Sequence, residues 1–167
     1  IDNIKKYKHL HMIGIGGVSM SGIAEILHHW GFKVTGSDAN SSEITDKLIK
    51  SGIPVKIGHD LENLRNADAV IFTAAIKKDD PEMLEATKLN IPLIERCDFL
   101  GELTKSFGNT IGISGTHGKT TTTSMVSVCF LKANMDPNIQ VGGILKQIDG
   151  NYKIGNSEYF IIEACEY

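Results

Sequence analysis

At residues 112–123 the chain reads Gly112-Ile-Ser-Gly-Thr-His-Gly-Lys-Thr-Thr-Thr-Thr123, which combines close glycines with a lysine and a run of threonines. Residues 110–113 form an apolar run that predicts a buried strand, and apolar residues from Met125 to Leu131 follow at the i+3/i+4 spacing of a helix. Glycines let backbone N–H groups approach an anion, and the N-terminus of the following helix adds the positive end of its dipole. The stretch therefore predicts a strand–loop–helix unit that binds phosphate.

Lys119 and Thr120 are the two side chains that this kind of loop uses. The lysine supplies a mobile positive charge to the phosphates, and the hydroxyl after it can reach Mg²⁺. The general spacing G-x-x-x-x-G-K-[ST] is not met, because residue 113 is isoleucine and the nearest preceding glycine is Gly115. A turn that only begins a helix is the alternative, but the strand before the loop and the helix after it favour nucleotide binding.

The composition is that of a globular protein. The chain has 167 residues, with 41% hydrophobic and 22% charged residues and a net charge of −3, so a general nucleic-acid or membrane-surface binder is not expected. No apolar run approaches the ~20 residues of a membrane helix, and residues 1–6 lack the apolar region of a signal peptide. Cys97, Cys129 and Cys165 are too scattered for a disulfide framework or a zinc site. We expect reduced, buried thiols in a cytoplasmic protein.

A second glycine-rich turn lies near the N-terminus. Residues 8–15 read as a strand, a helical pattern ends at Gly31, and residues 33–36 form a second strand that leads into Ser37 and Asp38. The turn between the first strand and the helix holds Gly14, Gly16 and Gly17. This β–α–β unit places an anionic group of a ligand over the N-terminus of its helix.

The dinucleotide fingerprint G-x-G-x-x-G fits this turn only in part. Gly14 and Gly16 match, but the third glycine position holds Ser19. Asp38 lies about where the ribose-binding acid of a dinucleotide site would lie. The pattern leaves three possibilities open: a dinucleotide, another diphosphate ligand, or glycines that serve only tight packing.

Strands and helices continue to alternate up to residue 105. Helices are expected at residues 42–51, 81–89 and 98–105, and further strands at 54–57, 69–72 and 92–95. With the two strands of the first unit, this makes five strands. Such alternation predicts a Rossmann-like, doubly wound parallel sheet.

The pattern restarts near residue 107 with the strand that enters the Lys119 loop. We therefore predict one domain at residues 1–106 and the beginning of a P-loop ATPase-type α/β domain at residues 107–167. After the Lys119 helix we expect a turn at Gly142 and Gly143, a polar segment to Ser157 and a single strand at residues 159–162. An ATPase domain does not close that early, so the sequence is expected to be the front portion of a longer protein.

Three segments give the chain a specific resemblance. They are His11-Met-Ile-Gly-Ile-Gly-Gly-Val-Ser-Met-Ser-Gly-Ile-Ala24, Gly115-Thr-His-Gly-Lys-Thr-Thr-Thr-Thr123 and Glu163-Ala-Cys-Glu-Tyr167. In this order they resemble the N-terminal part of Mur ligases. Residues 20–24 favour the branch that joins L-alanine to UDP-N-acetylmuramate over the branch that recycles a murein tripeptide.

The resemblance implies that the first domain binds the UDP-sugar. The residues expected at that site are Gly14, Gly16, Gly17, Val18, Ser19, Met20, Ser37, Asp38, His59, Thr73 and Ala74. The glycine-rich turn would hold the UDP diphosphate, and Ser37 and Asp38 would face the uridine. The family usually carries serines at the start of the turn where this chain has Thr73 and Ala74.

The resemblance also implies that the second domain binds ATP and Mg²⁺. The residues expected on ATP are Gly115, Thr116, His117, Gly118, Lys119, Thr120 and Thr121, with Lys119 acting in catalysis. Thr120 and Glu163 would hold Mg²⁺, and Glu166 would lie beside them. A carboxylate at a strand end suits this hard cation, which prefers oxygen ligands.

The implied reaction is acyl activation by phosphoryl transfer. The substrate carboxylate attacks the γ-phosphate of ATP, and the amine of L-alanine then displaces phosphate from the acyl phosphate. Two other classes remain as alternatives: an NAD-binding oxidoreductase built on Gly14, Gly16 and Asp38, and a nucleotide-sensing module without a ligase step. The sequence predicts no oligomeric state.

Overall fold

The computed structural model describes residues 2–164, which fall into two compact units divided between Glu102 and Leu103. The division lies inside a helix rather than at residue 107, where the strand pattern restarts. The assignment of the UDP-sugar to one unit and of ATP to the other stays a prediction.

The N-terminal unit is built on a five-stranded parallel sheet in the order β3-β2-β1-β4-β5. Its strands are β1 (His9–Ile13), β2 (Lys33–Asp38), β3 (Val55–Ile57), β4 (Ala69–Phe72) and β5 (Leu93–Glu95). The chain order reverses at β1, as in doubly wound nucleotide-binding folds. This confirms the fold class and all five predicted strands.

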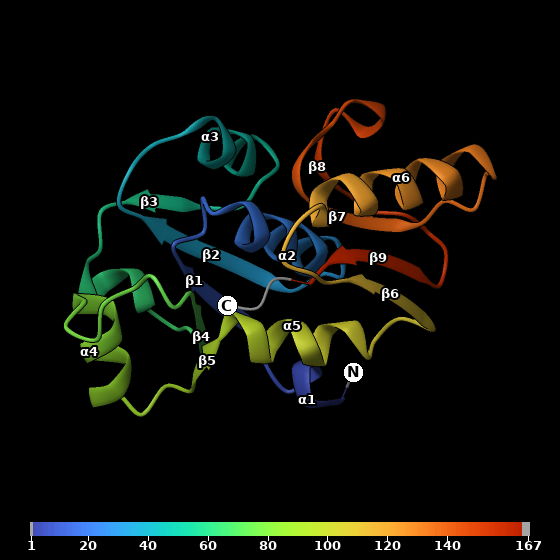
Figure 1. Cartoon of the computed structure of the whole chain (residues 1–167). Helices are drawn as coiled ribbons and strands as arrows, with labels where there is room; N and C mark the ends of the chain where they lie inside the picture. The colour runs from blue at the N-terminus through green and yellow to red at the C-terminus, as the bar shows by residue number, and fades with distance from the viewer. Residues whose placement is uncertain (1, 165–167) are drawn as a thin grey trace. The chain divides into compact units, whose positions relative to one another are not determined.

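Helices cover both faces of this sheet, with α2 (Val18–His29) and α3 (Glu43–Lys50) on one and α4 (Pro81–Lys88) on the other (Figure 1). The remaining helices are α1 (Asp2–Lys5), the 3₁₀ helix η1 (Leu61–Leu64) and α5 (Arg96–Thr104). The sequence analysis did not predict α1 or η1, which are only one turn long.

The helix boundaries follow from local chemistry. The Ser42 hydroxyl accepts from the Thr45 N–H and Thr45 bonds back to the Ser42 N–H, which forms a capping box at the start of α3. The Asp80 carboxylate caps α4, whose first residue is Pro81. Under α4, Ile13, Val70 and Met83 pack in one buried cluster. These contacts fix the helices against the sheet and so fix the loops at the strand ends.

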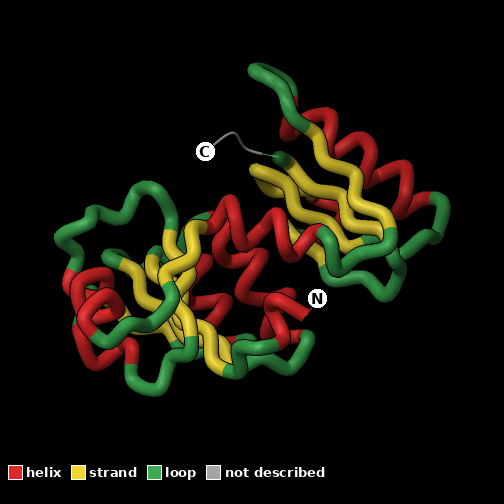
Figure 2. Tube along the Cα trace, turned by 90° about the horizontal axis from the view of Figure 1, so that it is seen from below, coloured by secondary structure: helices red, strands yellow, loops and turns green. Residues whose placement is uncertain are grey.

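The C-terminal unit has a four-stranded sheet in the order β6-β9-β7-β8. The strands are β6 (Asn109–Ile113), β7 (Asn138–Leu145), β8 (Gly150–Lys153) and β9 (Tyr159–Glu163), and all pairs are parallel except β7 with β8. Helix α6 (Lys119–Lys132) runs along one face of these strands (Figure 2). Val128 and Leu131 of α6 pack on the buried Ile139 and Val141 of β7.

The prediction of a single strand after α6 is wrong. Gly142 and Gly143 do not form a turn but lie inside β7, and the polar segment that follows contains the 3₁₀ helix η2 (Lys146–Ile148) and β8. Glycines weaken a strand pattern, which concealed β7 in the sequence. Lys153 of β8 pairs with Asp136, and this contact together with two hydrogen bonds from Asn156 lowers the pKa of the Asp136 carboxyl to about 2.

The prediction that the cysteines are buried is wrong for Cys97 and Cys129. Cys97 and Cys129 are free thiols, as expected, but both are exposed. Cys165 and Glu166 lie outside the described residues. Within residues 2–164, none of the helices is both long and apolar enough to span a membrane.

Candidate functional site

The first glycine-rich turn connects β1 to α2 and is held by the end of β2. The Gly14 and Ile15 N–H groups both donate to the Ser37 carbonyl, at 2.8 and 3.0 Å. The turn closes through a bond of 3.1 Å from the Gly17 N–H to the Gly14 carbonyl. Gly17 caps α2 without a side-chain contact, and the first turn of α2 carries no acidic residue. The dipole of α2 therefore favours an anion at this place.

Asp38 lies directly against this turn. Its Oδ2 accepts from the Gly16 N–H at 2.9 Å, and its Oδ1 accepts from the Asn40 N–H at 3.2 Å. A Cβ on Gly16 would come within 2.8 Å of Asp38 Oδ2 and 3.0 Å of Thr45 Cγ2. Gly16 is thus the residue that allows the carboxylate and the turn to approach each other.

We predict that Gly16→Ala weakens UDP-sugar binding by about tenfold, because the added methyl group must displace Asp38 or the turn itself. The check is calorimetric titration of the 167-residue chain with UDP-N-acetylmuramate. Gly101→Ala is the matched control, since a Cβ there meets no atom within 4 Å. Equal affinities for the two variants would contradict the proposed place of the turn in the site.

The other predicted UDP-sugar residues lie at the carboxyl ends of neighbouring strands. The register pairs Ile13 with Ser37 and Phe72, so β1, β2 and β4 end at the same edge. Thr73 follows β4, and its hydroxyl would lie 3.8 Å from a Cβ on Gly14. Ala74 is exposed at the same strand end. Parallel sheets bind ligands at this edge.

His59 lies beyond β3 and contacts Asp80, the residue that caps α4. Its Nδ1 is 2.6 Å from Asp80 Oδ2. His59, Asp80 and Glu82 also place ligand atoms within 4.8 Å of one another, as a metal site would. However, Asp80 caps α4, and four donors surround the Glu82 carboxylate. This cluster serves as a structural network in the fold.

Two predicted contact residues cannot offer their side chains to a ligand. Met20 is 1% exposed and packs in the core, and Ser37 is fully buried. The Ser37 hydroxyl donates to Glu82 Oε2 at 2.6 Å. Ser37 thus reaches the turn through its carbonyl group, and Met20 can contribute only backbone atoms. Val18 and Ser19 are less buried and lie in the first turn of α2.

Arg96 is a residue at this edge that the predicted site did not include. It begins α5 immediately after β5, and its Nη1 donates to Ser19 Oγ at 3.1 Å. The guanidinium group therefore lies at the N-terminus of α2, where it adds positive charge. Its position after a predicted strand was the only signal in the sequence.

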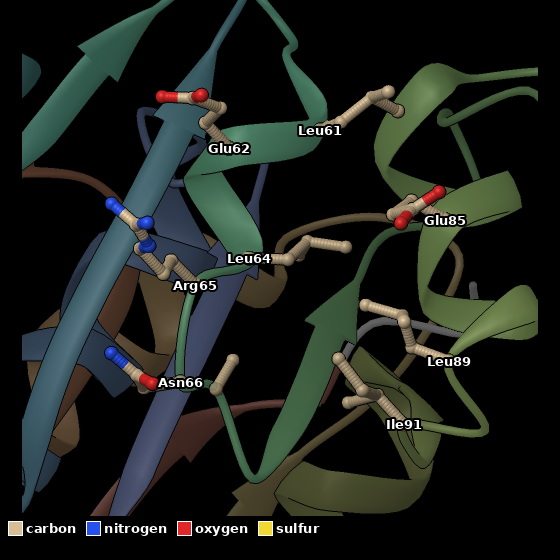
Figure 3. Close-up of a pocket in the computed structure, with 9 residues that line it drawn as sticks. Leu61, Glu62, Leu64, Arg65, Asn66, Glu85, Leu89 and Ile91 are labelled. Carbon is tan, nitrogen blue, oxygen red and sulfur yellow. The ribbon is translucent and has the colours of Figure 1, made fainter.

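A pocket of about 390 Å³ lies between η1 and α4 (Figure 3). Asn66 and Ala67 line it just before β4, and Ile91 lines it just before β5. These residues mark the amino ends of the strands. Ligands of parallel sheets bind at the carboxyl ends, so this pocket is separate from the candidate site.

The second glycine-rich loop joins β6 to α6. Gly118 caps α6 with a φ of +76°, a left-handed conformation that favours glycine, and makes no side-chain capping bond. The first turn of α6 carries no acidic residue. Lys119 Nζ donates to the Gly115 carbonyl at 2.5 Å and so folds back over the loop. Thr116, His117 and Thr121 are exposed around it.

Glu163 lies beside this loop at the end of β9, opposite Ile113 in the register. Its Oε1 accepts from Thr120 Oγ1 at 3.0 Å, and its Oε2 accepts from the Gly142 N–H at 2.7 Å. The structure thus brings the two predicted metal ligands together. A threonine hydroxyl and a carboxylate are oxygen ligands of the kind that Mg²⁺ uses.

Gly142 is the second residue that the sequence analysis missed. A Cβ at this position would lie 2.6 Å from Glu163 Oε2, so only glycine permits the observed approach of the carboxylate. The position of Gly142 beside Glu163 was not predicted, because two consecutive glycines indicate a turn rather than a strand. Recognition of β7 as a strand beside β9 would have found it.

Comparisons with known proteins agree with this geometry. The model of the Mur ligase family, catalytic domain, matches residues 9–108. The chain is 58% identical over 162 residues to UDP-N-acetylmuramate–L-alanine ligase of Clostridium botulinum (strain Okra / Type B1), covering 97% of this chain and 35% of the relative. It is 54% identical to the ligase of that name from Acetivibrio thermocellus, covering 97% of this chain and 34% of that relative.

Solved structures of two ligases are also similar to this chain. The UDP-N-acetylmuramate-alanine ligase of Thermotoga maritima matches 94% of this chain and 37% of its own, with a TM-score of 0.87 and 33% identity. The UDP-N-acetylmuramate:L-alanyl-gamma-D-glutamyl-meso-diaminopimelate ligase of Neisseria meningitides matches 96% of this chain and 53% of its own, with a TM-score of 0.88 and 32% identity.

The fold defines an α/β protein with a glycine-rich loop in each of its two units, and the chain belongs to the Mur ligase family. It spans about a third of the length of the curated relatives it matches. The resemblance expected from the sequence is confirmed.

Proposed function

We propose that this chain is the N-terminal part of an ATP-dependent ligase that joins L-alanine to the carboxylate of UDP-N-acetylmuramate in peptidoglycan synthesis. The N-terminal unit would bind the UDP-sugar, and the C-terminal unit would bind ATP and Mg²⁺. The observation that carries this proposal is the bond between Thr120 and Glu163 beside the Lys119 loop. It joins the loop that would bind phosphate to the carboxylate that would bind the metal.

The choice of substrates rests on the relatives. Curated relatives at 54–58% identity carry the name UDP-N-acetylmuramate–L-alanine ligase. The solved ligase whose title names a tripeptide substrate is 32% identical to this chain. The first group therefore favours L-alanine as the amine, and murein-tripeptide recycling is the second candidate. A cytoplasmic location is part of the proposal.

In this mechanism the chain positions reactants and stabilises charge. Lys119 leaves the Gly115 carbonyl and neutralises the β- and γ-phosphates, while the N–H groups at the start of α6 hold their oxygens. Thr120 and Glu163 would hold Mg²⁺, which would supply further positive charge at this site. The substrate carboxylate attacks the γ-phosphorus and ADP leaves. The amine then attacks the acyl phosphate, and inorganic phosphate leaves as the amide forms.

The test is phosphate release by the full-length protein given ATP, Mg²⁺, L-alanine and UDP-N-acetylmuramate. We expect release only when all four are present, because the acyl phosphate forms on one substrate and is consumed by the other. Release that does not depend on L-alanine would contradict the ligase assignment. A tripeptide that replaces L-alanine with higher kcat/KM would favour the recycling ligase.

A further inference from the structure

A buried polar network crosses the N-terminal sheet beneath the candidate UDP-sugar site. It runs from His9 through Thr35 and His11 to Glu82 of α4. His11 and Glu82 are 1% and 0% exposed. A buried carboxylate is costly unless its oxygens are paired, so such a network calls for an explanation.

The contacts of Thr35 and Asn66 show which nitrogens of the two imidazole rings must carry a hydrogen. His9 Nδ1 faces the Asn66 carbonyl at 2.7 Å and must carry a hydrogen to bond to it. His9 Nε2 and His11 Nδ1 both lie 2.9 Å from Thr35 Oγ1. A hydroxyl has one hydrogen, so it can donate to only one of these nitrogens, and the other nitrogen must donate to it.

The last nitrogen, His11 Nε2, lies 3.3 Å from Glu82 Oε2. This oxygen also accepts from the Ser37 hydroxyl, and Oε1 accepts from the Asn63 amide and the Asp60 N–H. Burial acts to raise the pKa of the Glu82 carboxyl, but the hydrogen bonds from His11, Ser37 and Asn63 outweigh it and lower the pKa. Apart from His11, three donors point at this carboxyl group, namely the Ser37 hydroxyl, the Asn63 amide and the Asp60 N–H, and they stabilise its charged form. Glu82 is therefore a carboxylate, and His11 Nε2 donates to it.

Three of the four ring nitrogens therefore carry hydrogens, and two neutral imidazoles have only two. Burial lowers the pKa of His9, with the charges of Lys33 and His11 acting in the same direction, against the bond to Asn66 and the charge of Asp68. Of the two rings, His11 is the one that faces the Glu82 carboxylate, so the extra proton belongs to His11. The ring donates from Nδ1 to Thr35 and from Nε2 to Glu82, while Thr35 donates to His9.

We infer that Glu82 forms a buried ion pair with a doubly protonated His11 and acts through it as a positioning residue for the UDP-sugar site. Glu82 holds the Ser37 hydroxyl, and the Ser37 carbonyl holds the Gly14 and Ile15 N–H groups of the turn. The other Glu82 oxygen holds Asp60 and Asn63, next to His59. Its positioning role rests on the proposed function, whereas the ion pair does not.

The ion pair is tested by ¹⁵N NMR of the histidine rings in the 167-residue chain at pH 7. We expect both nitrogens of His11 to carry protons and His9 to be neutral with its proton on Nδ1. Signals are assigned with His9→Gln and His11→Gln. The exposed His28 and His29 serve as internal controls for rings in solvent. A neutral His11 at pH 7 would overturn the ion pair.

The positioning role is tested with Glu82→Gln, which keeps the shape of the side chain but removes its charge. We expect His11 to become neutral in this variant and the Kd for UDP-N-acetylmuramate to rise at least about fivefold. In the full-length protein, KM for the UDP-sugar should rise while kcat stays near normal. Glu85→Gln is the control, since Glu85 lies on the same helix and pairs with the exposed Lys88.

Ser37→Ala provides a second variant in case Glu82→Gln fails to fold. It removes the link to the turn but leaves His11 and Glu82 paired, so the affinity should fall while the His11 signals stay unchanged. Wild-type affinity in either folded variant would overturn the positioning role. If the unsubstituted chain fails to bind the UDP-sugar, the proposed function fails with that role, and the NMR result still decides the ion pair.

Discussion

Replacing Lys119 by alanine should lower ATP turnover by the full-length protein about 10³-fold, while the affinity for the UDP-sugar stays near normal. The Lys119 ammonium group is the cation that the loop brings to the phosphates, where α6 begins and where its first turn has no acidic residue. Without it, the negative charge that develops on the transferred phosphoryl group loses the cation that this loop supplies. The residues that we propose to bind the UDP-sugar lie in the other compact unit, so their contacts should persist.

The measurement is phosphate release for turnover and calorimetric titration for UDP-N-acetylmuramate binding. Lys132→Ala is the matched control, because Lys132 is an exposed lysine in the last turn of the same helix. We expect the control to keep both properties. A parallel loss of turnover and UDP-sugar affinity in Lys119→Ala would contradict the assignment of one ligand to each unit.

Glu163→Gln should lower ATP turnover by about 10²-fold and weaken the apparent affinity for Mg²⁺ at least ~10-fold. Loss of a group that only orients a metal ligand typically costs 10–100-fold in affinity, and a direct ligand should cost no less. Glutamine retains one oxygen for the Gly142 N–H or for Thr120, but it removes the negative charge that attracts the cation.

Mg²⁺ titration of phosphate release measures this effect. Glu158→Gln is the control, since Glu158 is an exposed acid that immediately precedes the first residue of β9, whereas Glu163 is the last residue of that strand. An unchanged Mg²⁺ requirement in Glu163→Gln would show that the carboxylate only braces Thr120 and Gly142. Turnover that recovers at high Mg²⁺ would support its role as a metal ligand.

The fold of the N-terminal unit was predictable because its signals are local. Apolar runs such as residues 69–72 mark strands buried on both faces, and caps such as Ser42 and Asp80 mark where helices begin. The C-terminal unit was harder, because β7 contains Gly142 and Gly143 and ends in an antiparallel pair with β8. Its strand character depends on pairing with β9, which sequence patterns do not report.

For the candidate sites too, the sequence revealed some features and not others. Residues in the glycine-rich loops and at strand ends could be named from motifs, and the structure brings Thr120 and Glu163 together. Contacts made across the sheet could not be named, because they join residues distant in sequence. Arg96 reaches Ser19 from 77 residues away, and Glu82 takes up the hydroxyl of Ser37. Nor does residue type report that the side chains of Met20 and Ser37 are buried.

The most direct test of the whole account is calorimetric titration of the 167-residue chain with UDP-N-acetylmuramate and, separately, with NADH. Asp38 accepts from the Gly16 N–H, so the turn and this carboxylate form one surface that either ligand would have to meet. We expect saturable binding of UDP-N-acetylmuramate, binding about tenfold weaker in Gly16→Ala, and no binding of NADH. Tight binding of NADH without binding of the UDP-sugar would contradict it.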